Sequence, residues 1–163
     1  FGIGPQLRFK LINEPGARKL NFNLQARAVY STDFSSIDHR GYVFNPKLNY
    51  IREHVTGLDL KVFTSMGPIF ATEKLMDYFY QVDPEFVTST RPAYDADAGY
   101  LGSNMTLGVS KRFNSRFRLM LGTRLGIHSG ATNDDSPLFK DELNVSVFSA
   151  FIWSFYQSEE LAR

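Results

Sequence analysis

Residues 19–30, KLNFNLQARAVY, alternate strictly between polar and apolar side chains. Successive side chains of a β-strand point to opposite faces, so one face of such a strand would be wholly apolar and the other wholly polar. The apolar face would run from Leu20 to Tyr30, and the polar face from Lys19 to Arg27. The pattern therefore predicts a strand, and it raises the question of what the apolar face is buried against.

The same period-two pattern recurs in further segments bounded by turn signals. The segments are residues 1–12, 19–30, 41–50, 58–70, 100–113, 116–128 and 143–156. They are longer than the ~5–6 residues of a typical globular strand and long enough for the ~9–11 of a tilted membrane strand. Short connections follow the first, third and fifth segments and long ones the second, fourth and sixth, as in outer-membrane barrels.

Aromatic side chains gather near the ends of these segments. Phe113 and Phe117 flank the shortest turn, and Trp153 and Phe155 close the last segment. Aromatic girdles at both membrane interfaces would have this distribution. We therefore predict an all-β, antiparallel transmembrane β-barrel of the outer-membrane type, with its apolar face against lipid.

A soluble sandwich or lipocalin-like barrel also alternates, but its apolar face packs inward. Here the polar face carries glycines among small polar residues and arginines, which favours a hydrated or loop-filled interior; they are Gly102, Gly108, Gly122 and Gly126. If the short turns are periplasmic, an odd number of strands precedes Phe1 in an even-stranded barrel. We expect one barrel domain over residues 1–163, the last seven strands of ten or twelve, lacking the N-terminal strands and signal peptide. Residues 71–98 would form a long extracellular loop.

Composition narrows the candidate chemistry. The chain has 163 residues and a net charge of +1, which gives no whole-chain argument for nucleic acid as a partner. It has no cysteine and three scattered histidines, so we expect no metal site and no cofactor. No apolar run is long enough for a transmembrane helix.

Basic side chains recur on the predicted lumen face. They are Arg8, Lys10, Lys19, Arg27, Lys47, Lys61, Arg112, Arg118 and Arg124. A basic lumen would attract anionic solutes, as rings of Arg and Lys do in anion pores. Alternatively, the acidic long loop folds inward and neutralises these bases, and we favour this because unpaired buried charge is costly.

Two stretches outside the strands invite a functional interpretation. The loop TEKLMDYFYQV places Leu75, Tyr78, Phe79 and Val82 at helical spacing, so it either caps the barrel as a short helix or remains a surface loop. His128 lies near Asp134, Asp135 and Ser136 in sequence, as a rim catalytic site would require. Asp-Asp-Ser-Pro is also ordinary turn chemistry, and we predict no catalytic residues.

The stretch from Tyr78 to Tyr100, YFYQVDPEFVTSTRPAYDADAGY, resembles the MipA/OmpV family of outer-membrane proteins. That family has an outer loop with a YFGV-like start and a G-x-P-x-Y-x-A-x-A-G-like end, and a later G-D-A-A-D-S-P-like loop. The matching positions are Tyr78, Phe79, Val82, Pro92, Tyr94, Ala96, Ala98, Gly99, Gly130, Asp135, Ser136 and Pro137. The resemblance covers nearly the whole chain, as the C-terminal portion of a family member.

The chain departs from the family pattern at three places. Gln81 stands where the family favours glycine, and Thr90 and Arg91 precede Pro92 in place of a nearby glycine. The family usually ends on an aromatic residue, whereas this chain ends in SFYQSEELAR, so Phe155 or Tyr156 would be that end, followed by a short tail.

The resemblance implies a non-enzymatic protein in the outer membrane of a Gram-negative cell envelope, in contact with outer-membrane lipid. The family's namesake is described as a scaffold that joins a murein lytic transglycosylase to a peptidoglycan synthase. The resemblance therefore implies these two enzymes as partners. The alternative, which follows from the basic lumen, is a small porin-like channel for polar or anionic solutes.

Overall fold

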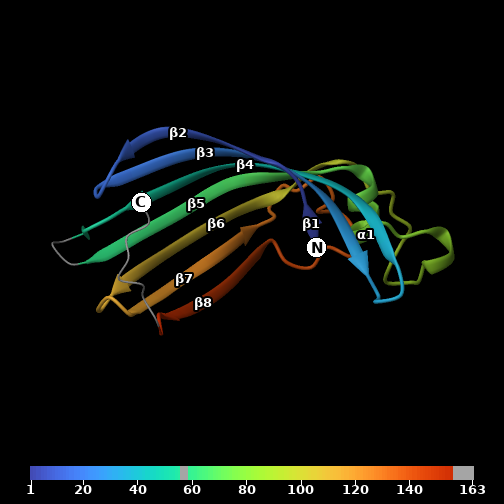
Figure 1. Cartoon of the computed structure of the whole chain (residues 1–163). Helices are drawn as coiled ribbons and strands as arrows, with labels where there is room; N and C mark the ends of the chain where they lie inside the picture. Colours follow the sequence, from blue (N-terminus) through green and yellow to red (C-terminus); the bar gives the residue numbers. More distant parts are fainter. Residues whose placement is uncertain (56–58, 156–163) are drawn as a thin grey trace.

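The computed structural model describes residues 1–55 and 59–155 of the chain. Its strands form one antiparallel sheet in the order β1-β3-β4-β5-β6-β7-β8, with β2 also paired to β3, and the sheet curls into a half-barrel (Figure 1). The elements are β1 (Gly2–Ile3), β2 (Gln6–Glu14), β3 (Arg18–Thr32), β4 (Ile37–Arg52), β5 (Leu60–Ala71), α1 (Glu73–Tyr80), the 3-10 turn η2 (Pro84–Phe86), β6 (Gly99–Arg112), β7 (Phe117–Ile127) and β8 (Leu143–Trp153). Within the described ranges, no helix is both long and apolar enough to span a membrane.

The predicted strands are present, but the first predicted segment is broken into β1 and β2, which both pair with β3. The break falls at Gly4 and Pro5. Proline has no N–H to donate to the ladder, and at this point the Pro5 carbonyl accepts the Ala26 N–H at 3.2 Å instead. Two parts of the sequence prediction lie outside the described residues. One is Leu58, at the start of the fourth segment, and the other is residues 156–163, at the end of the last segment and in the tail.

The prediction of a long loop after the second segment is wrong. β3 and β4 pair as far as Thr32 and Ile37, so residues 33–36 alone connect them. Asp33 closes this turn, because its Oδ1 accepts the N–H groups of Ser35 at 2.9 Å and Ser36 at 2.8 Å. β3 and β4 therefore form a long hairpin with a short turn.

Prolines interrupt the ladder between β4 and β5. The paired positions run from Val43 and Phe44 directly to Leu48, leaving the stretch around Pro46 and Pro68 without ladder pairs. The Asn45 side-chain amide donates to the Pro68 carbonyl at 2.6 Å and replaces part of the lost bonding. Two prolines are therefore tolerated inside a sheet because a neighbouring side chain satisfies the backbone.

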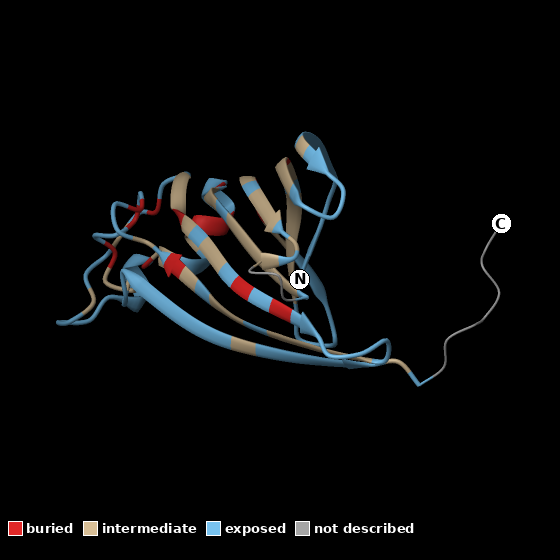
Figure 2. Cartoon of the chain, turned by 90° about the vertical axis from the view of Figure 1, so that its left-hand side faces the viewer, coloured by how far each residue is buried: buried red, intermediate tan, exposed pale blue. Residues whose placement is uncertain are grey.

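The two faces of the sheet have inverted polarity. The inner face, which carries Asn23, Asn45 and Ser110, buries polar side chains. The outer face exposes large apolar ones, among them Phe44, Met66, Leu107, Leu121 and Val147. Figure 2 shows buried and exposed positions alternating along strands of the sheet. In a soluble protein this pattern would be reversed, so the outer face requires an apolar environment.

Aromatic rings form two groups at opposite ends of this apolar face. At the turn end, where residues 113–116 connect β6 to β7, Phe117 contacts Phe113 and Phe151 with ring centroids 5.2 and 5.0 Å apart. At the loop end, which carries α1, Phe70 lies 5.9 Å from Tyr100. Two aromatic groups flanking an aliphatic band are the arrangement of membrane-interface girdles.

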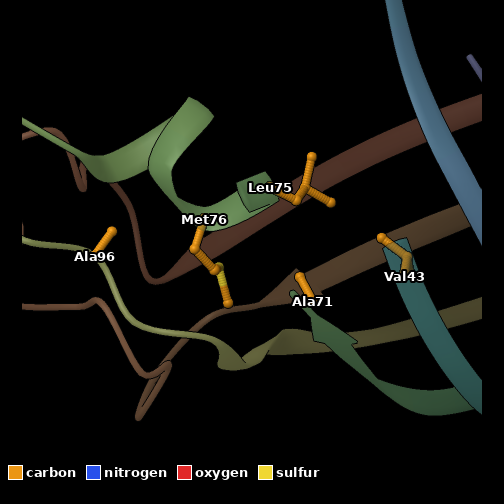
Figure 3. Close-up of a cluster of buried hydrophobic side chains, with 5 residues drawn as sticks. All are labelled: Val43, Ala71, Leu75, Met76 and Ala96. Atoms are coloured by element: carbon orange, nitrogen blue, oxygen red, sulfur yellow. The ribbon is translucent and has the colours of Figure 1, made fainter. Parts of the chain in front are cut away.

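The apolar core among the described residues lies at the loop end, beneath α1. Leu75 and Met76 of α1 pack with Val43, Ala71 and Ala96 (Figure 3). Of the two alternatives for residues 72–82, the short helix is the one present, and it packs on the inner face of β4. Its buried side chains are Leu75 and Met76, whereas the sequence placed Tyr78 and Phe79 on the same apolar stripe; both are exposed.

Gly41 allows α1 to approach the sheet closely. Its φ of +128° lies in a region that other residues rarely adopt, and a Cβ there would lie 2.6 Å from Thr72 Oγ1 and 2.9 Å from the Leu75 nitrogen. Thr72, which precedes α1, accepts the Tyr42 N–H through Oγ1 at 2.9 Å and donates its own N–H to the Tyr42 carbonyl at 3.1 Å. The helix is thereby attached to β4 at its first turn.

Candidate functional site

The register of the sheet places the predicted lumen-facing bases on the inner face. Arg8 and Lys47 both pair with Asn23, and Lys61 pairs with Ser110. The others occupy the same face by alternation from these positions; they are Lys10, Lys19, Arg27, Arg112, Arg118 and Arg124. The bases come from every strand from β2 to β7, so together they form a basic surface along the curved face.

Among the described residues, only two of these bases take part in an ion pair. Glu53, in the turn after β4, lies 3.2 Å from Lys61 and 3.8 Å from Lys19. A hydrogen bond from Lys61 holds the pKa of Glu53 below its ordinary value, with the charge of Lys19 acting in the same direction. The expected neutralisation by the acidic long loop is not found in residues 1–55 and 59–155, because that loop packs at the loop end and the acid comes from the turn end.

Among the described residues, three polar side-chain atoms on the inner face are buried without a hydrogen-bond partner: Asn23 Oδ1, Arg27 Nε and Asn49 Nδ2. Asn23 is only 6% exposed. One of these atoms is an acceptor and two are donors, so the surface can satisfy a polar ligand that offers both, or bind ordered water.

An apolar strip crosses the inner face and was not predicted. Phe63, Gly108, Gly122 and Phe148 are successive cross-strand neighbours on β5, β6, β7 and β8. The two phenylalanine rings lean over the two glycines, with their centroids 6.5 Å apart. The interpretation of these glycines as part of a hydrated surface is therefore wrong at Gly108 and Gly122, because aromatic rings cover both. The signal was the pair of phenylalanines that are out of phase with their segments.

The loop motif forms a bonded unit at the loop end. Val82 and Tyr94 make a two-way backbone bridge, with N···O distances of 2.9 and 3.1 Å. The Ala96 N–H donates to Gln81 Oε1 at 2.8 Å, and Ala96 itself is buried. Gln81, which departs from the family pattern, thus uses its side chain to close the loop on itself.

The later loop joins this unit through Asn133, which the sequence did not single out. Asn133 is 1% exposed; its Oδ1 accepts the Tyr94 hydroxyl at 3.2 Å and the Asp97 N–H at 2.9 Å, and its Nδ2 donates to the Asp97 carbonyl at 2.8 Å. Ser136 is also buried and donates its hydroxyl to the Tyr80 carbonyl at 2.8 Å. The two loops, distant in sequence, are held together by these side chains.

The remaining motif positions are mostly exposed, but Gly99 lies against the later loop, where a Cβ would collide with Thr132. Tyr78 is exposed, and the guanidinium carbon of Arg40 lies 4.5 Å from its ring centre. Gly99 opens β6, and Pro137 follows the buried Ser136. Phe79, Pro92, Ala98 and Asp135 are exposed.

The histidine and serine considered for catalysis do not form a catalytic pair. His128 Nδ1 lies 2.9 Å from the Leu101 carbonyl, whereas the Ser136 hydroxyl is donated to the Tyr80 carbonyl. A nucleophile must instead be hydrogen-bonded to its base. Within the part of the chain that is described, no group of three or more His, Cys, Asp or Glu residues is arranged to hold a metal ion.

An acidic group surrounds α1. Burial raises the pKa of Asp77 above its ordinary value, and the nearby charges of Asp95 and Asp83 raise it further. These residues border a hollow of about 510 Å³ that also includes Tyr78 and Arg40. The loop end is therefore acidic, while the inner face of the strands is basic.

A curled antiparallel sheet with an apolar outer face, two aromatic groups and a polar inner face defines a β-barrel protein of the outer-membrane type. The chain belongs to the MipA family: the family model described as MltA-interacting protein MipA matches residues 2–155. Comparison with curated proteins and with solved structures finds no match.

Proposed function

We propose that this chain is part of a non-catalytic outer-membrane barrel that acts as a scaffold for peptidoglycan-remodelling enzymes. The partners would be a murein lytic transglycosylase of the MltA type and a peptidoglycan synthase. The single observation that carries the proposal is the family match over residues 2–155. The short turns would face the periplasm, and the loop end would face outward.

The arrangement of the polar residues supports a role without catalysis. Ser136 and Asn133, the buried polar residues of the loop end, bond to backbone groups or to Tyr94. These hydrogen bonds hold the two loops together. The outer face would anchor the assembly in lipid, which leaves the turn end as the surface available to periplasmic enzymes.

The test is capture of a purified MltA-type lytic transglycosylase by the full-length protein, folded in detergent and immobilised. We expect saturable binding, and we expect no binding to an unrelated outer-membrane barrel prepared identically. Folding is checked by the heat-dependent shift of the barrel on a gel. Absence of saturable binding by the folded protein would contradict the scaffold proposal.

A second candidate is a small channel for polar or anionic solutes. The observation that favours it is the inner face, where Arg8, Arg27, Lys47 and Arg124 have no ion pair among the described residues. Unpaired cations that line a passage would favour anions.

Single-channel conductance of the full-length protein in a planar bilayer tests this second candidate. Steady openings with anion preference would support the channel, and we expect Arg124→Gln to weaken the preference because it removes one inner-face charge. A folded barrel that shows no openings would contradict it, whatever the result of the capture experiment.

A further inference from the structure

Three arginines cluster at the turn end of β6 and β7. Arg112, the last residue of β6, lies directly opposite Arg118 in the ladder, and Arg116 lies in the turn that joins these strands. Like charges directly opposite each other in a sheet destabilise it. A pair of arginines at such positions is therefore a cost to the isolated sheet.

No carboxylate among the described residues compensates this cost. The side chains of Arg112, Arg116 and Arg118 form none of the ion pairs or hydrogen bonds found in residues 1–55 and 59–155. Two acids line a hollow together with Arg112 and Arg118: Glu53 pairs with Lys61 and Lys19, and an Asp59 oxygen lies 3.9 Å from His54 Nδ1. The three guanidinium groups keep their donors available.

The cluster lies between two hollows that reach the surface. One, of about 290 Å³, is lined by Glu53, Lys61 and Ser110 together with Arg112 and Arg118. The other, of about 250 Å³, is lined by the same two arginines with Arg116 and Ser154. Side chains of a partner could enter on either side of the arginine pair.

The turn that carries the cluster is bonded at several points. Asn114 Oδ1 accepts the N–H groups of Arg116 at 2.9 Å and Phe117 at 2.8 Å, and the Ser154 N–H donates to the Arg116 carbonyl at 2.9 Å. A site that is already ordered loses less entropy when it binds. The fixed backbone therefore favours recognition of a defined partner.

The position of the cluster favours a protein partner over lipid. Arg112 and Arg118 share the inner face with the buried Ser110, whereas bilayer lipid would cover the outer face. Guanidinium groups bind carboxylates through paired hydrogen bonds, which suits the side chains of aspartate and glutamate.

We propose that Arg112 and Arg118, with Arg116 in the adjoining turn, form the docking site for a carboxylate-rich segment of the lytic transglycosylase. This inference rests on the proposed scaffold function and assigns the surface through which it acts. The site recognises acidic side chains on the partner, so binding depends on charge and weakens as salt rises.

The test compares two double variants of the full-length protein that remove the same number of positive charges from the same end of the sheet. R112Q/R118Q removes the cluster on the inner face. R52Q/K111Q removes two charges whose register places them on the outer face. Both must show the heat-dependent gel shift of the folded barrel before they are compared.

We expect R112Q/R118Q to weaken capture of the MltA-type transglycosylase by at least about tenfold, because two charge-assisted contacts are lost. R52Q/K111Q should stay within about twofold of the unmodified protein, since its charges lie on the other face. Raising sodium chloride should weaken binding by the unmodified protein more than binding by R112Q/R118Q.

A hexaglutamate peptide provides a second measurement that does not depend on the enzyme. We expect it to bind the unmodified protein and to compete with the transglycosylase, and we expect R112Q/R118Q to lose both effects. If the enzyme binds the unmodified protein and R112Q/R118Q equally well, the docking site is wrong and the scaffold function stands. If the enzyme does not bind at all, the scaffold function fails. Hexaglutamate binding that is insensitive to R112Q/R118Q overturns the docking site in either case.

Discussion

The strands and the loop end of this protein follow opposite rules of polarity. In the strands, leucine, valine and phenylalanine lie on the exposed outer face while asparagine and serine are buried. At the loop end, α1 buries Leu75 and Met76 and exposes Glu73 and Lys74. One part is built for an apolar environment and the other for water.

The comparison shows why sequence hydrophobicity has to be interpreted together with its period. A period of two over ten or more residues gives a strand two uniform faces, and the environment then decides which face is inside. A short helix has no such choice, because its apolar residues must pack on the nearest element. Here that element is the inner face of β4, where Val43 packs against Leu75 and Met76.

The largest expected effect is at the core beneath α1. Met76 is 0% exposed, and Met76→Ala should destabilise the packed loop end by about 2–5 kcal/mol because it leaves a cavity. Hydrogen exchange of the α1 amides and proteolysis of residues 72–98 would measure the loss. Phe79→Ala in the same helix is the control, since its ring is exposed, and an equal effect of both changes would contradict the assigned packing.

The polarity of the strands can be tested at Leu121, which lies on the outer face of β7 and is 46% exposed. Leu121→Arg should lower the free energy of unfolding in lipid vesicles by about 2–4 kcal/mol, because it places a charge against the hydrocarbon. Asn104→Arg, on the inner face of β6, should cost less. A larger cost at Asn104 would mean that the two faces have been exchanged.

The contact between the two loops depends on Asn133. Asn133→Ala would remove the partners of the Asp97 N–H and carbonyl, which should cost about 1–3 kcal/mol of local stability. Hydrogen exchange at Asp97 and in residues 128–142 would report it. Asp134→Ala, at an exposed neighbouring position, should have little effect; if it destabilises as much, the stability does not reside in the asparagine.

The smallest effect concerns pH at the loop end. Burial raises the pKa of Asp77, with Asp95 and Asp83 adding to the shift. A carboxyl whose pKa is higher in the folded state than in the unfolded one favours folding below its unfolded pKa. That contribution is lost as the pH rises through the folded pKa.

At neutral pH, Asp77→Asn should therefore stabilise the loop end slightly, by a few tenths of a kcal/mol, and should reduce its loss of stability between pH 4 and 7. Hydrogen exchange of the loop-end amides, measured on both proteins at pH 4 and at pH 7, would give these differences in stability. A variant that is less stable than the unmodified protein at pH 7 would contradict the assignment.

Much of the fold could be predicted from local pattern. The alternation in residues 19–30 predicted β3 and both of its faces, because side-chain direction along a strand depends only on position. The connection of residues 33–36 was missed because Asp33 and the serines that follow it are typical of loops in general, and only pairing with β4 shows how far the strands continue.

The candidate site was less accessible to sequence reasoning. The basic positions followed from alternation, but their lack of partners depends on where Glu53 and the acidic loop lie in space. The role of Asn133 could not be predicted, because it depends on hydrogen bonds to Tyr94 and Asp97, which lie far from it in the sequence. The contact of Phe63 and Phe148 with two glycines could not be predicted, because it depends on the register of four strands.

By itself, the sequence determined most of the strand positions and which face of each strand is apolar, and it left residues 72–82 as either a short helix or a surface loop. These properties come from periodicity and local preference, which act over a few residues. The tertiary structure alone decided that α1 buries Leu75 and Met76, that the two loops meet at Asn133, and that Arg112 and Arg118 lie between two hollows. Those properties depend on the register and curvature of the sheet, which bring together residues that are far apart along the chain.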